Sequence, residues 1–170
     1  MLVTFQKKPI SIKGSIPIVG EHAPDFELCS SDLNALTLAA MKGKKLILNI
    51  FPSVDTDVCA SSVRILNHMK SRGDNDLQDV LIVCISKDLP FAMKRFFDAE
   101  GISNCIVGSC FRSTNFMQDY GVEISSGLLR GLAARSIIVV GKDGLVKYNE
   151  LVQEITDEPN YKAAILACKN

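Results

Sequence analysis

The chain alternates between short apolar runs and longer segments in which apolar and polar positions follow a helical repeat. Continuous apolar runs at residues 45–51, 80–85 and 136–140 are typical of strands that are buried on both faces of a sheet. From residue 58 to 69, apolar positions recur at helical spacing and predict an amphipathic helix directly after the first run. Further helices are expected at residues 91–99, 113–119 and 161–168.

Shorter segments complete the expected architecture. Alternating residues at 3–5 and 10–12 predict an N-terminal β-hairpin, and a glycine-bounded turn at 141–144 predicts a later hairpin. Strands that alternate with helices, followed by this hairpin and a closing helix, indicate an α/β protein with a sheet covered on both faces. Residues 1–170 are expected to form a single domain. Short strands are also expected at residues 25–28, 36–38, 105–108 and 145–148.

One cysteine stands where the first apolar run meets the helix that follows it. Pro52 ends the run, Thr56 is a favoured N-cap residue, and Cys59 therefore falls in or near the first helical turn. Unpaired N–H groups and the positive end of the helix dipole favour a thiolate there. A surface helix dipole supplies about 0.3–1 kcal/mol, less than the roughly 3–4 kcal/mol that strong activation of a thiol requires. A cation from elsewhere in the chain is therefore expected beside Cys59.

Composition narrows the classes of function. The 19 basic and 19 acidic residues cancel, which argues against binding to nucleic acid or to an anionic membrane surface. No apolar run approaches the roughly 18 residues that span a bilayer, and the N-terminus does not have the order of a secretory signal. Cytoplasmic residence is therefore expected, without a structural disulfide framework for the six cysteines. Because Cys-x-x-Cys spacing is missing and there are only two histidines, no metal site is expected.

A motif around Cys59 relates the chain to a known family. Residues 52–59 read Pro-Ser-Val-Asp-Thr-Asp-Val-Cys, which matches the Pro-x-x-x-Thr-x-x-Cys signature of the peroxiredoxins, and the chain resembles their thiol peroxidase subfamily in particular. The resemblance runs from about residue 3 to residue 166 and implies a thioredoxin-like fold with a central mixed sheet flanked by helices. Supporting motifs are Ala-Pro-Asp-Phe at 23–26, Asp-Leu-Pro-Phe-Ala at 88–92, Ala-Glu-Gly at 99–101, Gly-Leu-Ala-Ala-Arg at 131–135 and Glu-Pro at 158–159.

The resemblance implies roles for four residues. The Cys59 thiolate would attack a hydroperoxide, hydrogen peroxide or an alkyl hydroperoxide, and become a sulfenic acid. Arg135 matches the active-site arginine of the family, and its guanidinium stays charged and offers several donors in one plane. Thr56 has two interpretations: its oxygen caps the helix by accepting the Cys59 N–H, or its hydroxyl bonds the sulfur or the substrate. Pro52 ends a strand and, by resemblance, covers the reactive sulfur.

The chain departs from the family pattern at the resolving cysteine. Thiol peroxidases usually carry this cysteine at the position of Phe97, and a phenylalanine cannot capture a sulfenic acid. Cys110 follows the end of a strand, and the carboxyl ends of parallel strands share one edge of a sheet. We therefore hypothesise that Cys110 resolves Cys59, with a one-cysteine cycle that uses an external thiol as the alternative.

The resemblance also implies partners. The electron donor would be thioredoxin or a similar thiol protein, the chain would form a homodimer, and its role would be antioxidant defence without a metal or another cofactor. Two other functions stay open. A redox sensor or binding protein would be oxidised at Cys59 without sustained turnover. A thiol–disulfide oxidoreductase is disfavoured because it would normally carry Cys-x-x-Cys.

Overall fold

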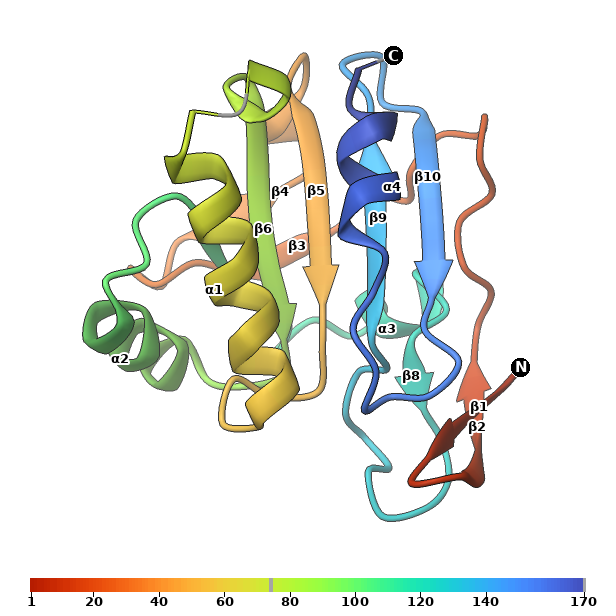
Figure 1. Ribbon diagram of the computed structural model, residues 1–170. Helices are drawn as coiled ribbons and strands as arrows, with labels where there is room; N and C mark the ends of the chain where they lie inside the picture. Colours follow the sequence, from red (N-terminus) through yellow and green to blue (C-terminus); the bar gives the residue numbers. More distant parts are fainter. Residues whose placement is uncertain (74, 170) are drawn as a thin grey trace.

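A central mixed sheet organises the molecule, as Figure 1 shows. The computed structural model describes residues 1–73 and 75–169. The sheet has seven strands in the order β10-β9-β5-β6-β7-β3-β4, with β5, β6 and β7 parallel and the other pairs antiparallel. The α/β thioredoxin-like fold expected from the sequence is confirmed. The strands are β3 (Glu27–Cys29), β4 (Ala35–Thr37), β5 (Lys45–Ile50), β6 (Val80–Ser86), β7 (Ile106–Ser109), β9 (Ser136–Val140) and β10 (Val146–Leu151).

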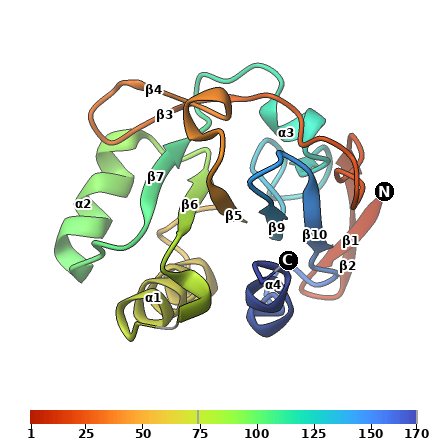
Figure 2. The ribbon, with the colours of Figure 1, turned by 90° about the horizontal axis from the view of Figure 1, so that it is seen from above.

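Helices and a small second sheet cover the two faces of this sheet. Figure 2 shows α1 and α4 side by side on one face, with α2 beside them toward the β7 edge. The other face carries α3 and a three-stranded sheet in the order β1-β2-β8. The expected N-terminal hairpin is therefore present. These elements are α1 (Asp57–Ser71), α2 (Pro90–Glu100), α3 (Phe116–Asp119), α4 (Tyr161–Ala167), β1 (Leu2–Phe5), β2 (Lys8–Lys13), β8 (Glu123–Ile124) and the 3-10 turns η1 (Ala39–Met41) and η2 (Asn75–Leu77).

Two hydrophobic cores result, one on each face of the seven-stranded sheet. In β5, Leu46, Leu48 and Ile50 enter the core beneath the small sheet, which we call the hairpin-side core. Ile47 enters the core beneath α1, α2 and α4, which we call the helix-side core. Because successive side chains of a strand point to opposite faces, a strand between two cores is mostly apolar, as residues 46–51 are. The exception is the buried Asn49, whose amide donates to the Ser62 hydroxyl at 3.1 Å.

Most expected elements are present, and their ends moved by a few residues. The strand at Ser136–Val140 has the expected bounds, and Gly101 closes α2 with a φ of 63°. The helix expected at 113–119 is shorter in the structure and consists of α3 alone. The Ser113 N–H bonds the Cys110 carbonyl, so the chain forms a turn before Phe116. In residues 1–73 and 75–169, no helix is long and apolar enough to cross a membrane.

Candidate active site

Cys59 lies at the junction of β5 and α1, at the carboxyl edge of the parallel strands. The chain leaves β5 through the buried Pro52 and turns into α1 at Thr56, whose backbone is extended with φ −112° and ψ 144°. Cys59 is the third residue of α1 and is completely buried, with 0% of its surface exposed. The expected position in the first helical turn is confirmed.

Two polar side chains approach the Cys59 sulfur. The Thr56 Oγ1 lies 2.7 Å from Sγ, and the Arg135 Nη2 lies 3.4 Å from it. Arg135 is 76 positions away in sequence and reaches Cys59 from the start of β9, which pairs with β5. The expected cation is therefore beside the thiol, and the sheet places it there.

Arg135 is buried, with only 2% of the residue exposed, and hydrogen bonds fix its position. Its Nε donates to the Ile155 carbonyl at 2.8 Å, and its own carbonyl accepts the Val152 N–H at 3.0 Å. No carboxylate forms an ion pair with it in the part of the chain that the structure describes. A buried charge without a counter-charge is costly. The Cys59 sulfur, 3.4 Å from Nη2, is the position at which a negative charge would pair with this guanidinium.

The Thr56 hydroxyl serves the sulfur rather than the helix end. Thr56 is the N-cap residue of α1, as expected, but its side chain does not form the expected hydrogen bond with the Cys59 N–H. The hydroxyl lies between Cys59 Sγ and the Ser53 carbonyl, at 2.7 and 3.1 Å, and its single hydrogen can point to only one of them. The hydroxyl is therefore within donating distance of the Cys59 sulfur.

Asp88 is a site residue that sequence reasoning missed. Its carboxylate accepts hydrogen bonds from the Ser53 hydroxyl and the Val54 N–H, both at 2.8 Å, and so anchors the loop that carries Thr56. The Ser86 hydroxyl, at the end of β6, donates to the same carboxylate at 2.8 Å. The available signal was the Asp-Leu-Pro motif that follows the second apolar run, but no local pattern shows which loop that aspartate holds.

The structure separates Cys59 from the other candidate thiol. Cys110 lies in the hairpin-side core, whereas Cys59 lies in the helix-side core, with the sheet between them. Burial raises the pKa of Cys110 to about 12. Phe97 fills the helix-side core from α2, where the family pattern would have a cysteine. All six cysteines are free thiols.

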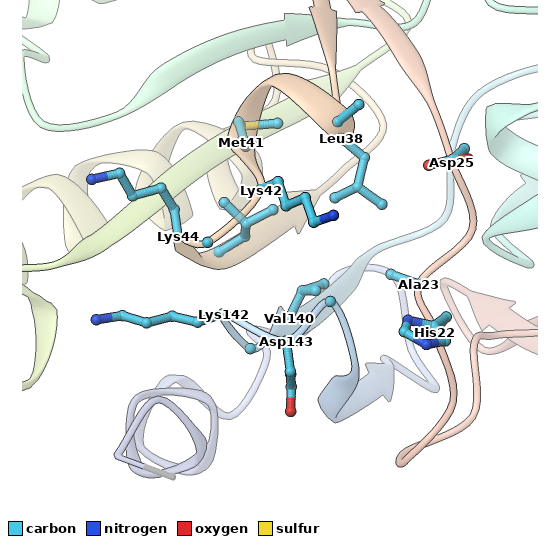
Figure 3. A pocket seen from close by; sticks show the side chains of 15 residues that line it. His22, Ala23, Asp25, Leu38, Met41, Lys42, Lys44, Val140, Lys142 and Asp143 are labelled. Atoms are coloured by element: carbon cyan, nitrogen blue, oxygen red, sulfur yellow. The ribbon is translucent and has the colours of Figure 1, made fainter.

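A separate cavity of about 400 Å³ lies at the opposite end of β5. Figure 3 shows Lys42, Lys44 and Lys142 around it, with His22 on the other side. Its walls include Leu46 at the start of β5, whereas Cys59 follows the end of that strand. It is therefore not part of the Cys59 site. Among the described residues, no three His, Cys, Asp or Glu side chains gather into a metal-binding group.

Comparisons with known proteins agree with this site. A family model described as Redoxin matches residues 18–165, which include the whole Cys59 site and Arg135. The thiol peroxidase of Vibrio cholerae is 45% identical over 168 residues, with 98% of this chain and 99% of that protein covered. The thiol peroxidase of Mycobacterium tuberculosis is 47% identical over 165 residues, with 97% and 96% covered.

Solved structures share the fold. A peroxiredoxin-like protein from Aquifex aeolicus superposes with a TM-score of 0.90 at 34% identity, covering 99% of this chain and 95% of its own. The thiol peroxidase of Chromobacterium violaceum gives a TM-score of 0.83 over 96% and 92% of the two chains; at 23% identity this shows the fold alone. The fold and the buried thiol define a cysteine-based peroxidase of the thioredoxin-like class. The chain belongs to the Redoxin family, and within it to the thiol peroxidases of the peroxiredoxin group.

Proposed function

We propose that this protein reduces hydrogen peroxide and alkyl hydroperoxides through a sulfenic acid on Cys59. The thiolate attacks one peroxide oxygen, the O–O bond breaks, and the second oxygen takes a proton and leaves as water or an alcohol. The sulfur gives up two electrons and the peroxide accepts them. The observation that carries this proposal is the buried Arg135 guanidinium, 3.4 Å from the sulfur and without a carboxylate ion pair among the described residues.

Arg135 suits a reaction in which negative charge moves from sulfur to oxygen. Its Nη2 faces the sulfur, and its buried Nη1 has no hydrogen-bond partner in the described chain. An unsatisfied buried donor is costly, and a peroxide oxygen placed beside the sulfur would satisfy it. A donor that is already oriented toward developing charge stabilises the transition state without reorganisation.

The loop before α1 limits what reaches the sulfur. Pro52 and Val54 are buried, and Cys59 has no exposed surface, whereas Thr56 is exposed. A peroxide must therefore enter past Thr56, and a larger alkyl group requires the loop to shift. Small hydroperoxides are the substrates that this entrance favours.

Resolution by an external thiol fits the geometry better than resolution by Cys110. A disulfide requires Cα atoms within about 7 Å, and the sheet separates Cys59 from Cys110. The hypothesis that Cys110 resolves Cys59 therefore requires large rearrangement at the sheet edge. Thioredoxin or a similar thiol protein is the proposed reductant, in the cytoplasm and in antioxidant defence. Peptide mapping after one equivalent of peroxide discriminates the two routes: a trappable Cys59 sulfenate supports the external thiol, and a Cys59–Cys110 bridge contradicts it.

The experiment that tests the proposed function is peroxide turnover with Cys59→Ser. We expect wild type to consume peroxide continuously when thioredoxin, its reductase and NADPH are supplied, and Cys59→Ser to show no turnover above background. Cys168→Ser is the matched control, because Cys168 follows α4 and its carbonyl accepts a hydrogen bond from Lys45 at the start of β5, away from Cys59, so turnover should be unchanged. Oxidation of one equivalent in wild type, followed by no turnover with any thiol, would instead indicate a redox sensor.

A further inference from the structure

Cys84 and Cys105 are neighbours in the helix-side core. Cys84 is in β6 and is paired in register with Val107 of the parallel strand β7. Cys105 directly precedes β7, two residues before Val107. Because side chains alternate between the faces of a strand, this parity puts Cys105 on the face that carries Cys84. Both thiols belong to the helix-side core.

The two thiols are in contact and differ in their surroundings. A hydrogen bond with Cys105, together with complete burial, raises the pKa of Cys84 well above its ordinary value. Cys105 is partly exposed and lines a surface depression of about 300 Å³ with Phe97, Ile102 and Lys94. The pair therefore has one sulfur that solvent and small oxidants reach and one sulfur directly behind it.

We propose that Cys84 and Cys105 form a second redox site, in which a hydroperoxide converts the two thiols into an intramolecular disulfide. This goes beyond the proposed function and takes from it only the class of oxidant. The proposed disulfide requires no chemistry from Cys59, Thr56 or Arg135, although Cys84 lies near the carboxyl end of β6, where Asn49 contacts its sulfur at 3.9 Å.

The chemistry balances in two steps. The Cys105 sulfur, as thiolate, attacks a peroxide oxygen, the O–O bond breaks, and the departing oxygen takes a proton and leaves as water or an alcohol. Cys105 is now a sulfenic acid. The Cys84 sulfur then attacks it, the S–O bond breaks, and the Cys84 proton leaves with the hydroxyl as water. The product is the Cys84–Cys105 disulfide, and the peroxide has taken up two electrons.

The neighbouring backbone allows this bond to close. A disulfide needs Cα atoms within about 7 Å. Cys84 pairs with Val107, so Cys105 is its diagonal neighbour, and diagonal neighbours on adjacent strands lie about 7–8 Å apart. Because Cys105 precedes the first ladder residue, Ile106, it can move closer to Cys84 without breaking a strand hydrogen bond. The bond would tie β6 to the connection between α2 and β7 and would withdraw Cys105 from the depression beside Phe97.

The test is disulfide mapping in Cys59→Ser, which is scored independently of peroxidase turnover. The full chain is treated with excess hydrogen peroxide, free thiols are blocked with N-ethylmaleimide, and unreduced peptides are analysed by mass spectrometry. We expect a peptide pair that joins Cys84 to Cys105, with both thiols lost to alkylation. Reduction with dithiothreitol should return both thiols.

Three variants provide the comparisons. Cys105→Ser should abolish the linked peptide, and Cys84→Ala should leave Cys105 as a trappable sulfenic acid. Cys110→Ser should leave the link unchanged, because that thiol lies in the hairpin-side core. The proposal is overturned if Cys105 stays fully alkylatable, is oxidised to sulfinic acid with Cys84 still reduced, or pairs only with another chain. If wild type shows no peroxide turnover, the proposed function is overturned, but the disulfide mapping of Cys84 and Cys105 still decides this proposal.

Discussion

At the scale of single residues, the site depends on the shape of the Arg135 side chain as well as its charge. One nitrogen is fixed by the Ile155 carbonyl, a second faces the Cys59 sulfur, and the third is unpaired. A planar guanidinium performs these three tasks at once, whereas an ammonium group is a single point charge on a flexible chain.

Arg135→Lys should therefore retain a cation near the sulfur and still lose most of the rate. Removing one oriented donor from a developing negative charge costs roughly 10²–10³ in rate, and we expect a loss of this size in the second-order rate of Cys59 oxidation. Stopped-flow measurement with hydrogen peroxide reports that step directly. Arg130→Lys, at a surface position, is the control. Equal rates for Arg135→Lys and wild type would mean that charge alone suffices.

At the scale of elements, the loop between β5 and α1 is held from the end of β6. The Asp88 carboxylate satisfies Ser53 and the Val54 N–H, and the Asp88 carbonyl accepts a hydrogen bond from Ser109 at the end of β7. The ends of three neighbouring parallel strands thus position the loop that carries Thr56.

Asp88→Asn should loosen this loop. The amide offers one acceptor oxygen in place of two, and hydrogen bonds to charged groups contribute about 1.5–3 kcal/mol each. We expect a fall of about 1–3 kcal/mol in the free energy of unfolding, measured by urea titration, and slower Cys59 oxidation. Asp98→Asn removes only an exposed ion pair with Lys94 and should change stability by at most about 0.5 kcal/mol. Similar losses in both variants would contradict the anchoring role.

Glu154 binds the N-terminal hairpin through hydrogen bonds. It directly precedes Ile155, whose carbonyl accepts the hydrogen bond from Arg135. Burial alone would raise the pKa of Glu154, but hydrogen bonds from the Lys7 N–H, Thr4 and Thr156 outweigh burial and lower the pKa to about 2. The unfolded value is about 4.3. A lowered folded pKa stabilises the protein fully above the unfolded value, and this stabilisation disappears as the pH falls toward 2.

Glu154→Gln should therefore be less stable than wild type at pH 6, with a difference that shrinks between about pH 4.3 and pH 2. Thermal unfolding of both proteins across this range measures the difference. A gap that stays constant with pH would show that the Glu154 charge is not what fastens the hairpin.

At the scale of the whole molecule, an exposed apolar patch borders the Cys59 edge. Phe91 is 63% exposed at the start of α2, close in sequence to exposed Leu89. Phe111 is also exposed, and its backbone is tied to the same edge, because its N–H bonds the Ser109 hydroxyl, which in turn donates to the Asp88 carbonyl. Contiguous apolar surface on a small protein commonly marks an interface. This patch is our candidate for the homodimer contact implied by the family resemblance.

Phe91→Glu should shift a homodimer toward monomer, because a carboxylate would be buried in the contact. Sedimentation velocity over a range of protein concentrations measures this shift. Leu128→Glu is the matched control: Leu128 is 91% exposed, lies in a different loop, and should leave the association unchanged. A dimer that survives Phe91→Glu, or a wild type that is monomeric throughout, would place the contact elsewhere or remove it.

The long elements and the core of the site were predictable from sequence because their signals are local. The run before Pro52 and the spacing after Cys59 depend on neighbours within a few residues, and both elements formed as expected. The role of Thr56 was not settled, because its hydroxyl has a choice of partners and only the loop geometry selects the sulfur. The anchor supplied by Asp88 was invisible, because it joins two loops that are distant in sequence.

The sequence by itself determined that a thiol stands at the start of a helix after a buried strand, and which family such a chain resembles. Only the tertiary structure decided how closely Arg135 approaches that thiol and on which face of the sheet each other cysteine lies. The physical reason is parity: along β7, Val107 enters the helix-side core and Ile106 packs on the hairpin-side core. A shift of one residue exchanges the faces, and long-range strand pairing sets that register. The same register puts Cys110 and Cys59 in different cores and Cys105 on the face that carries Cys84.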